Sequence, residues 1–328
     1  MASEAQVDAS QQTLSHRIVA AWKHGDRLYQ GLILLATLLV LLLVVLIGYE
    51  LWSTSDLSRK AFGLGFLTST RWDPAIDREF GALPFIQGTL ITSVLALIFA
   101  VPISLGVAVL LSDLAPNWLR QPLNYLVELL AAVPSVVFGL WGLFVFIPAF
   151  VKPTGEFLNA SLGFLPFFAG PVFGPSRLAA AFILAIMVMP TIAAISRDVF
   201  RAIPNNQREA ALALGATRWE MISQVLIPYG LSGIWGAIIL GFGRALGETM
   251  AVTMVIGNNL DLTASILHPG YTMASIIANE FTEATYPLYV SALIEIGLIL
   301  FIMTLFLNLG ARFLIYRVAK RTSPEARI

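Results

Sequence analysis

Apolar residues follow one another along this chain in long runs that charges rarely interrupt. The first run, from Leu28 to Tyr49, contains 22 residues without a charge. A helix that crosses the hydrocarbon core of a bilayer needs about 20 apolar residues, and the run exceeds the apolar core of a secretory signal peptide. The pattern therefore predicts membrane-spanning helices. Six are expected, at about 28–49, 87–110, 123–150, 178–196, 229–256 and 286–309.

Composition supports this class of protein. Hydrophobic residues make up 57% of the 328, charged residues only 12%, and the mean hydropathy is +0.80. Soluble domains carry about 25% charged residues, so we expect an all-α integral membrane protein. There is no cysteine, which excludes disulfides and thiolate chemistry. The three histidines are far apart in sequence, so no metal site is expected.

The charges also predict an orientation. Six spans place both termini on one side, where 13 of the 20 Lys and Arg residues fall, against six on the other side and Arg244 within a span. Because positive residues favour the cytoplasm, both termini are expected there. The predicted organisation is a cytoplasmic tail at 1–27, the first helix at 28–49, a periplasmic loop at 50–86, a five-helix core at 87–310 with a cytoplasmic loop at 199–228, and a second tail at 311–328.

Four prolines lie inside these apolar runs: Pro102, Pro134, Pro148 and Pro190. Each removes one backbone hydrogen bond and is expected to kink its helix. A static kinked bundle and a moving pathway are both compatible with this pattern.

The loop at 199–228 has the pattern of a helical hairpin. Two short helices are predicted. Asn206 with Glu209 and Thr217 with Glu220 have the spacing of capping boxes, Gly215 is the expected terminator of the first helix, and Pro228 is expected to end the second. The first helix has a face of small residues, which lets a helix approach a partner's groove closely. The alternative is a surface hairpin that only links two spans.

The stretch "GFGRALGETM", Gly241 to Met250, places an Arg and a Glu inside the fifth span. Three residues separate its last two glycines, whereas two residues stand there in the motif of a dinucleotide-binding loop. We therefore exclude a dinucleotide-binding loop. Arg244 and Glu248 are expected to form an i, i+4 pair, on one helix face and within reach of each other. The pair is either a structural ion pair or a binding and gating site for an anion, since Arg binds tetrahedral oxyanions bidentately. The G-x-x-x-G step of Gly243 and Gly247 predicts close helix packing.

The hairpin resembles the EAA motif of the ABC importer permease family. Glu209-Ala210-Ala211, three residues, Gly215, nine residues and then Val225-Leu226-Ile227-Pro228 match the spacing of that motif, with Val225 and Ile227 at its aliphatic positions. The resemblance implies that the loop docks into an ATPase subunit and couples its closure to the spans. The implied coupling residues are Glu209, Ala210, Ala211, Gly215, Ile227 and Pro228. No Gly-Lys pair occurs in the chain, so it lacks a P-loop and the ATPase must be a partner.

Longer stretches are similar to the C-type permease subunits of phosphate-specific ABC transporters. They are "GRALGETMAVTMVIGN" at 243–258, "ELLAAVPSVVFGLWGLFVF" at 128–146, "GTLITSVLALIFAVPISLGVAVLLSDLAP" at 88–116 and "ANEF" at 278–281. The resemblance implies a type I importer permease fold in the bacterial cytoplasmic membrane, with Arg244 and Glu248 implicated in phosphate translocation. It implies no enzymatic activity and no cofactor in this chain. The implied partners are a second permease subunit (PstA-like), an ATPase dimer that binds ATP and Mg (PstB-like), a phosphate-binding protein (PstS-like) and a PhoU-like regulator.

Other functions stay open at this level. A permease of the same type could carry sulfate or molybdate. An ion-coupled secondary transporter would need no ATPase and predicts inverted repeats, of which the sequence shows no clear sign. A membrane scaffold or sensor would transport nothing. ATP-dependent uptake of one oxyanion over another separates these functions.

Overall fold

A computed structural model of the chain describes residues 29–322. Within this range the backbone is helical apart from turns, loops and two isolated β-bridges, which confirms the expected all-α class. The predicted tail at 1–27 lies outside the described residues, as do residue 28 and residues 323–328. The start of the predicted C-terminal tail at 311 is helical, because the last helix continues to Thr322.

The chain forms two compact units, Met1–Ser53 and Thr54–Ile328. The described part of the first unit lies in a single apolar helix, which runs from Tyr29 to Thr54, the first residue of the second unit, and so ends five residues beyond the predicted bound at 49. Its 26 residues give a length of about 39 Å at 1.5 Å per residue, enough to cross a bilayer.

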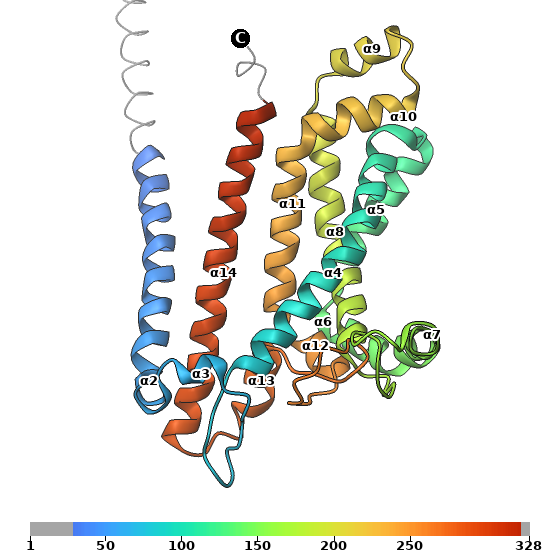
Figure 1. Cartoon of the computed structure of the whole chain (residues 1–328). Helices are drawn as coiled ribbons and strands as arrows, with labels where there is room; N and C mark the ends of the chain where they lie inside the picture. The colour runs from blue at the N-terminus through green and yellow to red at the C-terminus, as the bar shows by residue number, and fades with distance from the viewer. Residues whose placement is uncertain (1–28, 323–328) are drawn as a thin grey trace, which may run out of the picture. The chain divides into compact units, whose positions relative to one another are not determined.

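The second unit contains the other helices (Figure 1). In chain order they are α2 (Asp56–Phe62), α3 (Gly65–Thr68), α4 (Leu83–Val109), α5 (Asn117–Ala132), α6 (Ser135–Trp141), α7 (Lys152–Leu162), α8 (Arg177–Ala202), α9 (Asn205–Ala213), α10 (Arg218–Met221), α11 (Ile227–Gly247), α12 (Met250–Val255), α13 (Met273–Glu280) and α14 (Pro287–Thr322). Three π-helical segments, at Leu110–Leu114, Gly142–Val151 and Ile222–Leu226, extend or join these helices.

Six helices of the described chain are long and apolar enough to cross a membrane, as predicted. Their bounds are Tyr29–Thr54, Leu83–Leu114, Ser135–Leu162, Arg177–Ala202, Arg218–Gly247 and Pro287–Phe313. Most start earlier or end later than the sequence pattern indicates, because helices continue into polar residues at both ends. The predicted loop at 50–86 is also shorter, since α4 begins at Leu83 and the first helix ends at Thr54.

The third span is not the continuous helix predicted at 123–150. The backbone is extended at Val133 (ψ 129°) and at Pro134 (ψ 139°), so α5 and α6 are separate helices. The physical reason is steric, because a proline disfavours helical geometry in the residue before it. Glu128 therefore lies exposed on α5, outside any span. The other three intramembrane prolines, Pro102, Pro148 and Pro190, lie within helices as expected.

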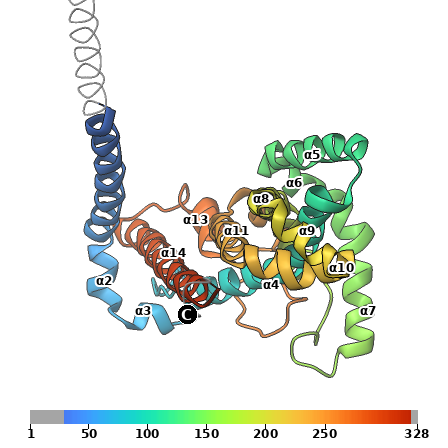
Figure 2. The same cartoon turned by 90° about the horizontal axis from the view of Figure 1, so that it is seen from above.

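Helix α8 forms the centre of the second unit, with α4 and α11 packed against it (Figure 2). In its most apolar window 67% of residues are buried, against 28% in the corresponding windows of the α4 and α11 spans. Its start is capped by the Ser176 hydroxyl, which accepts a hydrogen bond from the Ala179 amide at 3.2 Å. Its end is set by Pro204, because the preceding residue Ile203 is extended (ψ 127°).

Small residues bring α4 close to α8. Ala96, Ala100, Ser104 and Ala108 recur every four residues on α4 and are fully buried. The Ser104 hydroxyl donates to the Met189 carbonyl of α8 at 3.2 Å. Residues four apart lie on one helix face, so this stripe allows the two backbones to approach closely.

Glycines on α11 divide into a packed and an open face. A Cβ at Gly233 would lie 2.4 Å from Val199 of α8, and one at Gly241 would lie 2.7 Å from Ile192. A Cβ at Gly236 or Gly247 would meet nothing within 4 Å. The predicted close packing of this span is thus confirmed for the face toward α8. The G-x-x-x-G step of Gly243 and Gly247 is not packed within the described chain.

This division predicts opposite effects for two equivalent substitutions. Gly233→Ala and Gly236→Ala both replace an interior helical glycine, which favours the helix by about 1 kcal/mol. Only Gly233→Ala forces a methyl group against Val199, and overpacking costs about 1–3 kcal/mol. We expect Gly233→Ala to lower the melting temperature of the detergent-purified chain relative to Gly236→Ala, measured by circular dichroism. Equal melting temperatures would show that the α8–α11 contact adapts freely.

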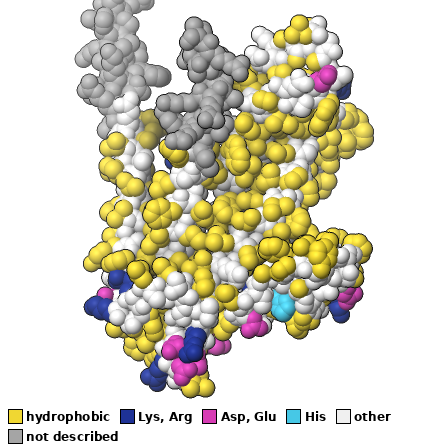
Figure 3. Space-filling view, viewed as in Figure 1, with side chains coloured by type: hydrophobic (Ala, Val, Ile, Leu, Met, Phe, Trp, Pro, Cys, Tyr) yellow, Lys and Arg dark blue, Asp and Glu magenta, His cyan; other side chains and the backbone are white. Residues whose placement is uncertain are grey.

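The end of the second unit opposite α9 has its own aromatic core. Trp72, Phe80, Phe85 and Tyr289 pack edge-on or stacked, with ring centroids 4.8–6.2 Å apart. The hairpin between α3 and α4 projects from this end and carries charged side chains of both signs, which gather at the bottom of Figure 3. In this hairpin the Asp73 carboxylate accepts hydrogen bonds from the amides of Ala75 and Ile76, which lowers the pKa of Asp73.

Arg177, at the start of α8, is fully buried and bonded to backbone carbonyls. Its guanidinium donates to the carbonyls of Asp261, Thr263 and Ser265. These acceptors all belong to the loop between α12 and α13. The sequence pattern indicates only that Arg177 precedes the span predicted at 178–196. The structure shows that Arg177 holds this loop onto α8.

Candidate functional site

The helix that carries Arg244 ends before Glu248, which corrects the predicted pair. Helix α11 terminates at Gly247, and Glu248 is extended (φ −68°, ψ 124°). Because the backbone leaves the helix there, Arg244 and Glu248 are not i, i+4 neighbours on one face. No ion pair joins them among the described residues. The Glu248 carboxylate instead accepts a hydrogen bond from the Ala251 amide at 3.3 Å, at the start of α12.

Arg244 is exposed and has no ion-pair or hydrogen-bond partner in residues 29–322. It follows Gly236 and Leu240 at intervals of four, so the three residues form one ridge along α11. Leu240 is also exposed, whereas Ala237 and Gly241 are buried toward α8. Arg244 therefore lies on the open side of α11, one turn before the break at Glu248.

Helix α12, which follows the break at Glu248, packs against α6, which follows the break at Pro134. A Cβ at Gly139 of α6 would lie 3.1 Å from the Ala251 Cα of α12, so the two backbones are in close contact. Helix α6 begins directly after Pro134, and α12 begins directly after Glu248 and Thr249. The helices that follow the two breaks are thus in contact, and Glu248 lies just before one of them.

The hairpin after α8 matches its prediction in most details. Gly215 has φ +88° and follows α9, and the Ala216 amide bonds to the Ala211 carbonyl at 3.2 Å, which is a Schellman termination. Thr217 and Glu220 form the predicted capping box. The predicted cap at Asn206 is wrong, because α9 already begins at Asn205 after Pro204.

The second helix of the hairpin does not stop at Pro228, as the sequence pattern predicted. Helix α10 continues through the π-segment Ile222–Leu226 into α11, one helix from Arg218 to Gly247. Pro228 falls in the first turn after this π-segment, where the wider turn accommodates its missing amide hydrogen. The second helix of the hairpin is therefore continuous with the span that carries Arg244.

The residues implied for ATPase coupling are distributed over this hairpin. Glu209 and Ala210 are exposed, Ala211 and Ile227 are partly buried, and Gly215 and Pro228 are exposed. Two large apolar side chains beside them also face outward, Leu214 with 90% and Trp219 with 71% of their surface exposed. Such exposed apolar residues at the tip of a short hairpin indicate a contact surface for another protein.

Arg208, which precedes the EAA residues, connects the hairpin to two spans. Its guanidinium bonds to the Asp113 carboxylate at 2.8 Å and to the carbonyls of Phe200 and Ile203 at 2.6 and 2.7 Å. The side chains of Arg208 and Asp113 are only 14% and 10% exposed. Asp113 lies in the π-segment at the end of α4, and Phe200 in the last turn of α8. Nothing in the sequence pattern indicates this connection, because its partners lie in other helices.

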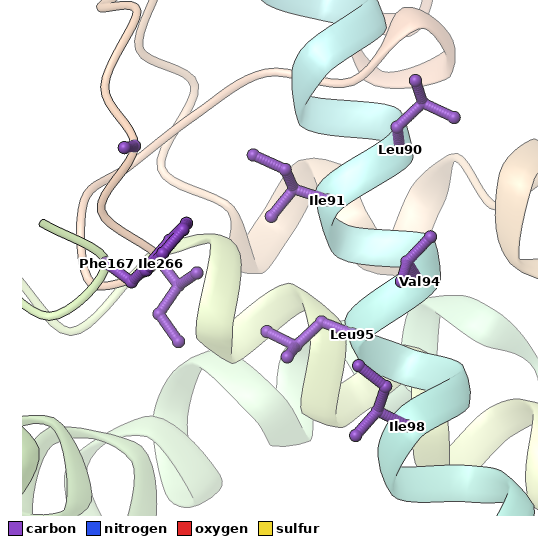
Figure 4. Close-up of a pocket in the computed structure, with 8 residues that line it drawn as sticks. Leu90, Ile91, Val94, Leu95, Ile98, Phe167 and Ile266 are labelled. Atoms are coloured by element: carbon purple, nitrogen blue, oxygen red, sulfur yellow. The ribbon is translucent and has the colours of Figure 1, made fainter.

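Two cavities lie along the spans of the second unit. One, of about 340 Å³, is lined only by apolar side chains, most of which Figure 4 labels: Leu90, Ile91, Val94, Leu95, Ile98, Phe167, Ala264 and Ile266. It offers no donor to an anion, so it is unsuited to a charged substrate. The other lies between α11 and α14 and contains Asn308 and Arg312. Among the described residues, no group of three or more metal-ligating side chains is present.

Comparisons with known proteins agree with this architecture. Residues 100–324 match the family described as binding-protein-dependent transport system inner membrane component. The phosphate transport system permease protein PstC of Haemophilus influenzae is 45% identical over 89% of this chain and 94% of its own. PstC of Mesorhizobium japonicum is 43% identical over 90% of this chain and 92% of its own.

A solved structure supports the fold independently. A chain of the bacterial alginate ABC transporter, solved with an alginate-bound periplasmic protein, aligns with a TM-score of 0.60 at 17% identity. The alignment covers 91% of this chain and 98% of that one. At this identity the likeness concerns the fold alone, and it agrees with the predicted type I importer permease fold. The chain is therefore a multi-pass protein of the cytoplasmic membrane that belongs to the binding-protein-dependent transport system inner membrane components and, within them, to the PstC permeases.

Proposed function

We propose that this chain is the permease subunit of an ATP-driven importer that moves inorganic phosphate across the cytoplasmic membrane. The observation that carries the proposal is the 45% identity to a phosphate transport permease over most of both chains. The chain contains no P-loop, so ATP and Mg are bound by a separate ATPase subunit.

Arg244 is the proposed phosphate-binding residue on the pathway. A guanidinium presents paired donors that fit two oxygens of a phosphate. In this conformation Glu248 is engaged at the start of α12, so Arg244 is left available to an anion. A charge in a span is costly when it faces lipid, which implies that the open side of α11 is covered by a second permease subunit and water. Glu248, directly after the end of α11, is proposed to weaken the binding of the anion through its negative charge and so to favour release.

The hairpin α9–α10 is the proposed docking site of the ATPase, through Glu209, Ala210, Ala211 and Gly215. The hairpin end of the second unit is then cytoplasmic. A cytoplasmic location of both termini is proposed from the distribution of Lys and Arg residues alone. Ile227 and Pro228 join the hairpin to α11, so closure of the ATPase dimer would move the helix that carries Arg244. The loops at the opposite end, with the projecting hairpin before α4, then face a phosphate-binding protein. A PhoU-like regulator would act from the cytoplasmic side.

The proposal is tested by transport with the assembled complex. The chain, a second permease, the ATPase and the phosphate-binding protein of the same organism are reconstituted in liposomes with ATP on the ATPase side. We expect uptake of labelled phosphate that requires ATP and that excess sulfate and molybdate leave unchanged. Uptake without ATP would indicate a secondary transporter, and uptake of sulfate or molybdate instead of phosphate would indicate a different oxyanion permease.

A further inference from the structure

The second cavity of the spans is a groove between α11 and α14. These helices run side by side in both views of the molecule (Figures 1 and 2). The groove has a volume of about 580 Å³ and is lined by Gly236, Ile239, Leu240, Leu305, Asn308, Leu309, Arg312 and Ile315. Gly236 contributes no side chain to its α11 wall, which leaves room for a ligand.

The polar groups of the groove are donors for an anion. Asn308 and Arg312 are four residues apart on α14 and therefore on one face, about 6 Å apart along the axis. Neither has an ion-pair or hydrogen-bond partner in residues 29–322. Among the described lining residues there is no carboxylate, so none of them neutralises the guanidinium of Arg312. A planar guanidinium beside an amide NH₂ fits the oxygens of a phosphate group.

The groove is also continuous with the position of Arg244. A Cβ at Gly243 would lie 4.0 Å from the Asn308 side-chain oxygen, so Asn308 is level with the turn of α11 that carries Arg244. Arg312 lies one turn further toward the end of the molecule that carries α9 and α10. Gly236 and Leu240, which line the groove, belong to the same ridge as Arg244. The donor side chains of Arg244 on α11 and of Asn308 and Arg312 on α14 thus follow one another along the same open side of the two helices.

We propose that Asn308 and Arg312 form a second phosphate-group binding site, one step beyond Arg244 toward the hairpin end of the spans. Two ligands share this chemistry. Free phosphate would occupy the site as it leaves Arg244, and this assignment rests on the proposed function. An anionic phospholipid would place its headgroup phosphate at Arg312, which lies at the last turn of the span, and its acyl chains along Leu305 and Leu309.

The experiment compares wild type, Arg312→Gln and Arg312→Lys in the complete complex, with Arg71→Gln as the control. Arg71 is exposed at the opposite end of the unit, so its loss removes one charge without touching the groove. Each complex is reconstituted in liposomes of phosphatidylcholine alone or with phosphatidylglycerol. Phosphate uptake is measured in both, and retained phosphatidylglycerol is counted by native mass spectrometry.

The two ligands give different results. If free phosphate binds, Arg312→Gln lowers uptake about tenfold in both lipids and Arg312→Lys restores part of it, because a single bidentate contact is lost. If phosphatidylglycerol binds, Arg312→Gln loses the retained lipid, and wild type in phosphatidylcholine alone behaves like the variant. Unchanged uptake together with unchanged lipid retention overturns the site. Absence of phosphate uptake by wild type would instead refute the proposed function, and the lipid count would still test the groove.

Discussion

Replacement of Arg244 by Gln is expected to reduce ATP-dependent phosphate uptake by about 100-fold or more, while the four subunits still assemble. Gln has a similar helical preference and stays polar, but its side chain is shorter and it removes the charge and the paired donors that bind a phosphate. Arg244 is exposed and has no partner within the described chain, so its loss breaks no internal contact. Uptake of labelled phosphate and co-purification of the subunits measure the two effects separately.

Glu248 supplies the matched comparison for Arg244. If its role is the hydrogen bond to the Ala251 amide, Glu248→Gln keeps an acceptor oxygen and retains most of the uptake, whereas Glu248→Ala loses it. If its charge acts on the anion or on Arg244, both variants are impaired alike. Near-normal uptake by Arg244→Gln would contradict the phosphate-binding role and would leave Arg244 as a residue of the interface between subunits.

The spans could be predicted because their signal is local. An apolar run of sufficient length dictates a helix in a bilayer, where every backbone group must be satisfied within the segment. The capping box at Thr217 and the positive φ of Gly215 were predictable for the same reason, since each depends on residues within one turn. These features needed no knowledge of distant parts of the chain.

The breaks were harder to predict, and for identifiable reasons. Pro134 was present in the sequence, but a proline inside an apolar run either stays within a helix, as Pro102 and Pro190 do, or ends one, and neighbouring residues do not decide which. The break at Glu248 has no proline at all. It lies next to the contact of α12 with α6, two segments more than a hundred residues apart, and such a contact cannot be read from neighbouring residues.

The contacts of Arg177 and Arg208 were not predictable from this one sequence. Arg177 bonds to carbonyls 84 to 88 residues away, and carbonyls leave no mark in the sequence because every residue has one. Arg208 pairs with Asp113 across 95 residues. The chain offers several acidic residues as partners, and only the fold selects Asp113. The same holds for Asn308 and Arg312, which become a site only because α11 lies opposite.

Replacement of Asp113 by Ala is expected to uncouple ATP hydrolysis from phosphate uptake. Asp113 pairs with Arg208 at 2.8 Å where both side chains are nearly buried, and removal of one partner from such a pair costs about 3–5 kcal/mol. Without Asp113 the guanidinium still bonds to α8 but no longer connects the hairpin to α4. Movement of the hairpin by the ATPase would then reach α4 incompletely, and each phosphate transported would consume more ATP.

A second ion pair of this chain serves as the control. Arg71 and Glu79 lie 3.0 Å apart, but their side chains are 69% and 48% exposed, so Glu79→Ala should cost less than about 1 kcal/mol and leave coupling unchanged. The measured quantities are the melting temperature of each complex and the ratio of ATP hydrolysed to phosphate taken up. Arg208→Met with Asp113→Leu separates stability from coupling, because two apolar side chains restore packing without the charge. If this double variant is stable yet uncoupled, the polar contacts of Arg208 with Asp113 and α8 carry the movement. A normal ratio in Asp113→Ala would show that the movement does not depend on the contact with α4.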